Sequence, residues 1–420
     1  LEMCLAVAPT GILGTAVTWA DLEKHLRAAF GTDARFGANK SVVDIGDGNG
    51  FASCCGLINC DWVGIAAEEK LPKTVVLKIP TAQALRKLND AAPEGQRMFN
   101  YTEEQWAEME AKFFNIHNTE VASYDFLDEF EGLAMPRKYY GRAVEEENKA
   151  EGQLCLEYMD NSRMMSFYEK HTVEQVRQIA RALGKIQACS LKKDVTAPAL
   201  QKNFFENIAN MWPLETYHGM FKGVLTVDSC DETKELMKKI DALLDTYHGS
   251  TLPSTIHTQH GFRPVLVNGD MHTGNVLIDQ DTGDLAALID WQCTHLGVGV
   301  EDLHRIALTA LTAEERRLHT PMLVEEMYKS MVEHLDGAEP PYSQEKLLVL
   351  SDILYPHCAL FFASVFASFI AKNDKDPSIS DEEKATRKEV TLNKLIGSLE
   401  DVLTIDITNK KHIGNLKFKE

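Results

Sequence analysis

The sequence predicts an α+β fold in two lobes, with an antiparallel sheet in the N-terminal lobe and mostly helices in the C-terminal lobe. Short apolar runs separated by turn residues fill much of residues 42–159, which is typical of strands. Longer amphipathic segments dominate from residue 173 onward, which is typical of helices. These observations place one lobe at residues 1–157, with a helical extension at its N-terminus, and the other at residues 158–420.

Composition restricts the classes of function. The 420 residues carry a formal net charge of -20, which leaves no basic surplus to bind nucleic acid or an anionic membrane surface. The nine cysteines are scattered and contain no C-x-x-C pair, so we expect a reducing, cytoplasmic environment rather than disulfides or a zinc site. We also expect no membrane span, because the most apolar segment, residues 347–371, contains Asp352 and is interrupted by Pro356.

The first residues predict an arm followed by a helix. Residues 1–17 are small and apolar without a period, so we expect them to be poorly ordered. Thr18 and Asp21 match a capping pair, and Gly31 can end a helix that reaches Phe30. A helix is therefore expected over residues 18–30.

A glycine turn between two strands is expected next. Residues 42–45 and 54–58 are largely apolar. Between them lie three glycines and a serine: Gly46, Gly48, Gly50 and Ser53. Glycines let backbone N–H groups approach a phosphate closely, although a plain hairpin tip gives the same pattern.

A lysine stands alone in the strand expected at residues 74–80. Lys78 either reaches solvent at a sheet edge or binds nucleotide phosphates, as the lysine of the third strand does in kinase folds. An acidic helix follows over residues 103–130, with an interruption at 115–119 where Asn118 would cap a second segment. Its glutamates are candidate partners of Lys78, and spacing does not choose among them: Glu108, Glu110 and Glu120.

Two further strands are expected at residues 137–142 and 153–159. The second ends in Glu157, Tyr158 and Met159 and runs into a polar crossover. This pattern suits a hinge whose backbone contacts an adenine ring, and it equally suits an ordinary strand end. Helices are then expected at 173–190, 204–208, 233–247, 301–311 and 313–335, and from residues 344 and 381 onward.

A hairpin within residues 265–292 carries the strongest chemical signal. The apolar runs 276–278 and 285–289 flank a polar turn, so Asn275 before the first strand and Asp290 after the second should meet at one end. Asp270 precedes Asn275 by five residues, which is the spacing of a kinase catalytic loop. Each residue alone is more often a turn former, but the combination favours phosphoryl transfer.

The order of the motifs resembles the CHK-kinase-like, or ecdysteroid-kinase-like, family, which groups with aminoglycoside phosphotransferases and choline kinases. The motifs are G-D-G-N-G-F-A-S, V-V-L-K-I-P, H-N-T-E-V-A-S-Y, L-C-L-E-Y-M, N-G-D-M-H-T-G-N-V-L and I-D-W-Q. The resemblance runs from about Gly11 to about residue 400, and G-T-A-V-T-W-A-D-L-E and F-G-A-N-K-S look most like the nematode branch.

The resemblance implies a protein-kinase-like fold and a role for each matched residue. It implies that Glu120 pairs with Lys78, and that Asp270 is the catalytic base. Asn275 and Asp290 would hold Mg²⁺. The remaining matched residues would contact ATP: Gly46, Gly48, Gly50, Ser53, Glu157, Tyr158 and Met159.

Further residues around this site are also matched. Asp302 would brace the catalytic loop, and Gly297 precedes it at the family's usual place. His272 is either loop packing or an acceptor contact. Aromatic residues of the later helices are either acceptor-pocket walls or core: Tyr355, His357, Phe361 and Phe362.

The expected activity is ATP- and Mg²⁺-dependent transfer of a phosphoryl group to a hydroxyl of a small molecule, such as a steroid-like, sugar-conjugate or amino-alcohol acceptor. Only residues 291–301 separate Asp290 from Asp302, and no Ala-Pro-Glu occurs, which argues against a peptide acceptor. Asn268 stands where the family usually has His. The alternative is therefore a pseudokinase, or a nucleotide- or small-molecule-binding protein without transfer activity.

Overall fold

The computed structural model describes residues 11–413, except 47–51, 92–96, 98, 146–150, 202–213 and 248–251. The chain divides into two compact units. The first comprises Leu1–Glu129 and Pro136–Asp160, and the second comprises Phe130–Met135 and Asn161–Glu420.

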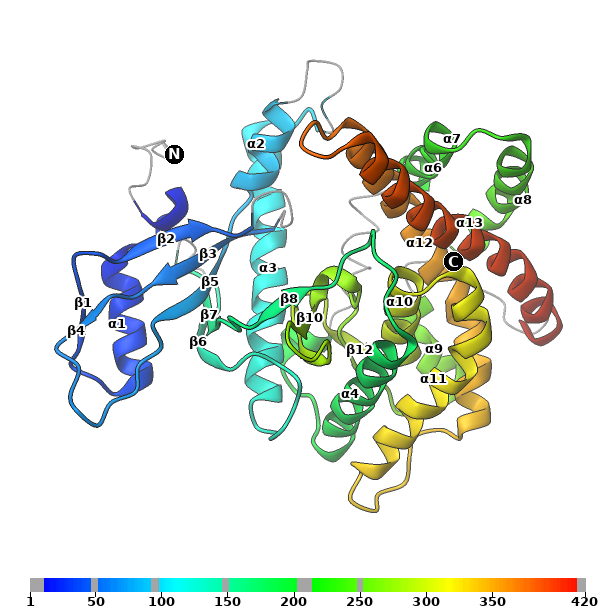
Figure 1. Ribbon diagram of the computed structural model, residues 1–420. Coiled ribbons are helices and arrows are strands. Elements are labelled where there is room, and N and C mark those ends of the chain that lie inside the picture. The colour runs from blue at the N-terminus through cyan, green and yellow to red at the C-terminus, as the bar shows by residue number, and fades with distance from the viewer. Residues whose placement is uncertain are drawn as a thin grey trace. The chain divides into compact units, whose positions relative to one another are not determined.

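A five-stranded antiparallel sheet forms the centre of the first unit, in the order β2-β3-β5-β7-β6 (Figure 1). Helix α1 packs on β6, and α3 packs on β5 and β6. The elements are η1 Ile12–Gly14, α1 Trp19–Phe30, β1 Arg35–Phe36, β2 Ser41–Asp44, β3 Ser53–Asn59, β4 Trp62–Val63, β5 Thr74–Pro80, α2 Gln83–Ala91, α3 Glu103–Leu127, β6 Lys138–Arg142 and β7 Gln153–Glu157. The glycine turn is expected between β2 and β3, and its Gly48 and Gly50 lie outside the described residues.

The expected helix caps are present in this unit. The Thr18 hydroxyl accepts a hydrogen bond from the Asp21 backbone N–H, the Asp21 carboxylate accepts one from the Thr18 N–H, and Gly31 ends α1 in a left-handed conformation. The arm predicted at residues 1–17 is wrong for the part that the structure describes. Ile12 and Val17 are buried in the core of this unit, because an apolar segment without a period can still pack through single side chains.

The predicted interruption of the acidic helix is also wrong, since α3 is continuous through Asn118. Its side chain does not cap a second helix. The Nδ2 group donates to the Val144 carbonyl at 2.9 Å, and Oδ1 accepts from the Val144 N–H at 2.7 Å. A polar residue that resembles a helix cap in the sequence thus joins the helix to the chain that follows β6.

The second unit is mostly helical. Helix α4 packs along α11, and α12 packs along α13 (Figure 1). The elements are β8 Ser162–Met164, α4 Val173–Lys192, η2 Pro198–Gln201, α6 Leu214–Lys222, α7 Val224–Val227, α8 Asp231–Tyr247, α9 Leu252–His260, β9 Val265–Val267, η3 Thr273–Asn275, β10 Val276–Asp279, β11 Leu285–Leu288, β12 His295–Gly297, α10 Val300–Ala310, α11 Ala313–Glu333, α12 Gln344–Lys375 and α13 Asp381–Ile413. The two units together confirm the predicted α+β class, and the helix predicted at 204–208 lies outside the described residues.

Helix α12 corrects the expectation drawn from Pro356. The helix continues through this proline, and it is long and apolar enough to cross a membrane by length and composition alone. Its most apolar window is 78% buried within the protein, as in the core helix of a globular domain. Proline removes the N–H that would reach the Asp352 carbonyl four residues earlier. The Asn409 side chain of α13 donates to that carbonyl at 2.8 Å, which replaces the lost hydrogen bond.

This replacement predicts a coupling between two distant positions. Asn409→Ala should lower the free energy of unfolding by about 1 kcal/mol, because the Asp352 carbonyl loses the hydrogen bond from Asn409. In a Pro356→Ala background the restored N–H of residue 356 should take over, and the same substitution should cost much less. Chemical denaturation of the four proteins of this cycle measures the coupling, and equal costs in both backgrounds would contradict the account.

Candidate functional site

The expected hairpin is formed by β10 and β11, in which Val276 faces Leu288. The N–H of Ile289 donates to the Asn275 carbonyl at 2.9 Å, which extends the pairing by one step beyond the strands. Asn275 and Asp290 therefore flank the same end of the hairpin, as the sequence predicts.

Asp302, in the first turn of α10, holds the loop between β9 and β10. Its Oδ2 accepts from the Asn268 N–H at 2.7 Å, and its Oδ1 accepts from the Gly269 N–H at 2.9 Å. Burial raises the pKa of Asp302 to about 7, while these two backbone donors oppose the shift. The bracing role implied by the resemblance is thus visible in the geometry.

Asn268, which stands where the resembling family usually has His, makes two hydrogen bonds within this loop. Its Nδ2 donates to the Asp290 carbonyl at 3.0 Å, and its Oδ1 accepts from the Asp270 N–H at 3.0 Å. One fully buried side chain therefore ties the backbone of the candidate base to that of a candidate metal ligand. Asn268 supplies both a donor and an acceptor where the loop needs them.

The Asp270 carboxylate is mostly buried, with 24% of the side chain exposed. The Asp270 backbone carbonyl accepts from Asn275 Nδ2 at 2.8 Å, and this bond orients the side-chain amide of Asn275. Burial raises the pKa of Asp270 to about 7; the Arg305 guanidinium lowers it, and the Asp290 carboxylate raises it further. A carboxyl group with a pKa near neutrality is suited to accept a proton.

His272 shapes the loop itself. Its Nδ1 accepts from the Gly274 N–H at 3.0 Å, so a neutral ring carries its proton on Nε2. Burial lowers the pKa of His272 to about 4, and the ring lies 5.1 Å from the ring of Phe167. Its Nε2 is 3.8 Å from Asp270 Oδ2, beyond hydrogen-bond length. Between the two roles open for His272, these contacts favour loop packing.

The residues at the hairpin end suit a Mg²⁺ site that is completed by substrate phosphates and water better than a metal site made of protein side chains alone. No group of three or more His, Cys, Asp or Glu side chains suited to a metal occurs within the described ranges. Mg²⁺ is usually held by one or two carboxylates together with substrate phosphates and water. Asn275 and Asp290 supply one amide and one carboxylate oxygen donor. Asp290 adopts a left-handed backbone (φ 60°), which its hydrogen bond to Asn268 helps to hold.

A layer of buried charge beneath this loop escaped the sequence interpretation. Glu301 receives hydrogen bonds from Arg305 Nη2 at 3.0 Å and lies 3.2 Å from His295 Nε2. The three side chains are at most 1% exposed. Gly269 (φ +81°) packs so closely against His295 of this layer that a Cβ would lie 2.9 Å from its Nδ1. The i, i+4 spacing of Glu301 and Arg305 on an apolar helix was the available signal.

In the first unit the structure brings Lys78 and Glu120 together. Lys78 occupies β5, the third strand of the sheet, and its Nζ lies 2.6 Å from Glu120 Oε2 of α3. Their side chains are 12% and 2% exposed. The resemblance selected this glutamate among three, and the geometry agrees with that selection.

Of the other residues expected to contact ATP, those that the structure describes lie in or just beyond the strands of this sheet. The Gly46 N–H donates to Asp44 Oδ1 at 3.0 Å, and Ser53 begins β3. The Glu157 carboxylate accepts from the Arg137 N–H at 3.1 Å, which fixes this side chain at the end of β7. Tyr158 and Met159 follow the end of β7, where Tyr158 is 37% exposed.

The aromatic residues considered as acceptor-pocket walls lie largely in the core of the second unit. Tyr355 donates to Asp401 Oδ2 at 3.1 Å, and His357 Nδ1 lies 3.4 Å from the Tyr247 carbonyl. The Arg305 guanidinium lies over the rings of Phe361 and Phe362, at 5.1 and 5.8 Å from their centroids.

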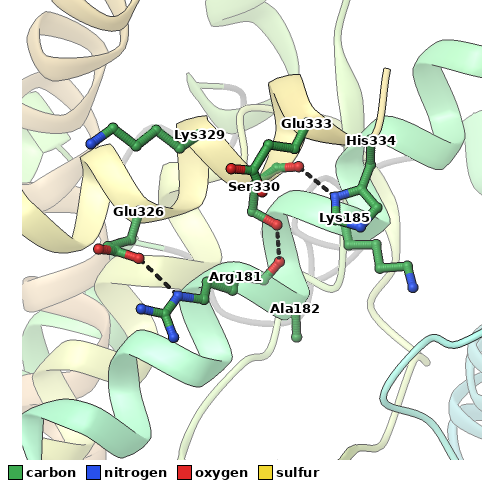
Figure 2. A pocket seen from close by; sticks show the side chains of 8 residues that line it. All are labelled: Arg181, Ala182, Lys185, Glu326, Lys329, Ser330, Glu333 and His334. Carbon is green, nitrogen blue, oxygen red and sulfur yellow. Dashed lines mark hydrogen bonds and ion pairs between the residues drawn. The ribbon is translucent and has the colours of Figure 1, made fainter. Parts of the chain in front are cut away.

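A cavity of about 310 Å³ lies elsewhere, between α4 and α11 (Figure 2). Figure 2 shows the Glu326 carboxylate directed at Arg181, which donates to it at 2.8 Å, and Ser330 bound to the Arg181 carbonyl at 2.7 Å. None of the predicted site residues lines this cavity. Its Arg181 and Glu326 side chains bind one another, so it is not a second candidate for the chemistry.

Comparison with known proteins gives one family match and one curated relative. The model of the family DUF1679, described as "Uncharacterized oxidoreductase dhs-27", matches residues 5–410. An uncharacterized kinase-like protein of Caenorhabditis elegans is 26% identical over 285 residues, which cover 65% of this chain and 72% of the relative.

Solved structures of small-molecule kinases are similar at low identity. A choline kinase of Cryptosporidium parvum is 10% identical and covers 88% of this chain and 91% of its own, with a TM-score of 0.44. The choline kinase LicA of Streptococcus pneumoniae is 13% identical and covers 89% and 97%, with a TM-score of 0.39.

Proposed function

Because the chain belongs to the DUF1679 family, and because its motifs and a relative are kinase-like, we propose that it is an ATP- and Mg²⁺-dependent kinase of a small molecule. It transfers the γ-phosphoryl group to a hydroxyl of a metabolite. The observation that carries this proposal is the loop in which Asn268 and Asp302 fix Asp270, Asn275 and Asp290 at one end of a hairpin.

Each residue has a defined role in this proposal. Asp270 orients the acceptor hydroxyl and accepts its proton, while Lys78, held by Glu120, neutralises phosphate charge on the nucleotide. Asn275 and Asp290 would hold Mg²⁺, which when bound supplies positive charge for the phosphate oxygens. Because the roles are placement and charge neutralisation, the protein needs rigid supports, and Asn268 and Asp302 provide them.

The family description suggests oxidoreductase chemistry, which the described strands do not favour. A dinucleotide-binding fold has a parallel sheet whose glycine-rich turn opens a helix. Every strand pair in the described part of the chain is antiparallel, and the glycine turn is expected between strands β2 and β3. Absence of NAD(P)H oxidation in the presence of a metabolite extract, alongside phosphate transfer, would agree with the kinase proposal.

The test is transfer of labelled γ-phosphate from ATP and Mg²⁺ to a metabolite extract. A labelled small molecule formed only with enzyme would establish the kinase and provide the acceptor for identification. ATP binding in the presence of Mg²⁺, without a labelled product from several extracts, would favour the alternative of a pseudokinase or binding protein. Failure to bind ATP would overturn the nucleotide site itself.

The role of Asn268 gives a separate prediction. Asn268→Asp keeps an acceptor for the Asp270 N–H, loses the donor to the Asp290 carbonyl and adds a carboxylate at a fully buried position. The transfer rate should fall by at least about 10-fold. Loss of one buried hydrogen bond costs about 1–3 kcal/mol, and the same increase in the activation barrier slows the reaction by that factor. Asn268→Ala removes both bonds without adding a charge, and should likewise lower the rate by at least about 10-fold. Steady-state rates of the two folded variants measure the difference, and wild-type rates in both would refute the supporting role.

A further inference from the structure

A lysine of α13 is completely buried and holds three backbone carbonyls. Lys394 is 0% exposed. Its Nζ donates to the carbonyl oxygens of Phe167 at 2.9 Å, Glu169 at 2.7 Å and Thr309 at 2.7 Å. An ammonium group has three N–H donors, so one charged side chain matches three acceptors, whereas a neutral amine has only two donors.

The three carbonyls belong to two segments that need such a partner. Thr309 is near the C-terminal end of α10, where the last carbonyls of a helix lack intrahelical donors and favour a positive charge. Phe167 and Glu169 lie in the connection between β8 and α4. Burial lowers the pKa of Lys394 to about 7; nearby Glu169 and Glu315 oppose this shift, and Arg316 and Lys170 add to it.

Both segments also contact the catalytic loop, defined here as residues 268–275. The Thr273 N–H donates to the Thr309 hydroxyl at 3.2 Å. The Phe167 ring lies 5.1 Å from the His272 ring, and a Cβ on Gly274 would lie 3.9 Å from the Phe167 ring. The loop therefore contacts both Thr309 and Phe167, and the backbone carbonyls of these two residues accept hydrogen bonds from Lys394.

We propose that Lys394 is a positioning residue, which fixes the α10 end and the β8–α4 connection so that the catalytic loop rests in its active geometry. The part of the proposal that concerns activity rests on the proposed kinase function. The part that concerns loop rigidity does not, because it follows from the contacts of Lys394, Thr309 and Phe167 alone.

The test compares Lys394→Met with two controls on the same helix. Lys388→Met removes a partly exposed lysine that pairs with Asp374 at 3.1 Å. Leu399→Ala makes a cavity in the hydrophobic core of the unit but keeps the Lys394 ammonium group on its three carbonyls, and so reports a general loss of stability. Lys394→Gln keeps two N–H donors and serves as the milder variant if Lys394→Met does not fold.

Hydrogen exchange at the Thr273 amide is the first readout, because it needs no catalytic activity. Lys394→Met should speed this exchange by about tenfold or more relative to Leu399→Ala at matched stability, which corresponds to one lost hydrogen bond. In Lys394→Met the kcat should fall by at least about tenfold, while the KM for ATP stays within about threefold of wild type. The kcat of Lys394→Gln should lie between those of the wild type and Lys394→Met.

The outcomes separate the two proposals. Equal exchange and equal kcat in Lys394→Met and Leu399→Ala would show that Lys394 only stabilises the fold, and would overturn the positioning role. A wild-type protein without transfer activity would overturn the proposed function, and the exchange at Thr273 would then decide on Lys394 by itself.

Discussion

Replacing Asp270 with asparagine is expected to lower the rate of phosphate transfer by about 10²- to 10⁴-fold, which is the usual contribution of a positioned acid or base. Asparagine keeps the size of the side chain and leaves the backbone bonds to Asn268 and Asn275 in place. It loses the group that accepts the acceptor's proton. Nucleotide binding should stay within about threefold of wild type, because this residue contacts neither phosphate nor metal in the proposed mechanism.

A matched control lies in the same hairpin. Asp281→Asn replaces an exposed carboxylate that accepts from Asn161 at 3.0 Å, and it should leave the transfer rate unchanged. Steady-state transfer and ATP titration of the wild type and both variants give the comparison. Retention of near-wild-type transfer by Asp270→Asn would remove this residue from the role of base, and parallel losses in both variants would point to a general charge effect.

Much of the fold could be predicted because local patterns determine it. Thr18, Asp21 and Gly31 carry the chemistry of a helix start and stop, and the structure has the helix between them. Asn118 and Pro356 misled because their effects depend on distant partners. Asn118 bonds the chain after β6, and Asn409 restores the hydrogen bond that Pro356 removes. In each case the partner lies more than about twenty residues away in the sequence, so the local pattern around the residue does not reveal it.

The candidate site shows the same division between local and distant information. The spacing from Asp270 to Asn275, and the hairpin after it, could be predicted because turns and alternation are local. Spacing alone did not identify the supports of the loop: the family resemblance implied Asp302 of α10, and Lys394 of α13 was missed. Lys394 lies more than a hundred residues beyond the loop and carries no motif. Residues that act through buried hydrogen bonds become visible only when the packing is known.

Variants of the ion pair between Lys78 and Glu120 should affect stability and phosphate transfer differently. Lys78→Met removes the ammonium group that lies 2.6 Å from the buried Glu120 carboxylate. Removal of one partner from a buried ion pair typically costs about 3–5 kcal/mol, so unfolding of the first unit should shift to lower denaturant. Transfer should fall by about a hundredfold or more, because the cation for the nucleotide phosphates is lost.

The double variant Lys78→Met/Glu120→Gln should recover much of the stability, since the buried carboxylate charge is then also gone. It should not recover transfer, because no cation has been returned to the phosphates. Lys73→Met, an exposed lysine just before β5, serves as the control that should change neither quantity. If the double variant transfers phosphate at the wild-type rate, Lys78 is a structural residue and its assignment to the nucleotide is wrong. If instead transfer stays lost while stability returns, the lysine acts on the nucleotide and Glu120 acts through it.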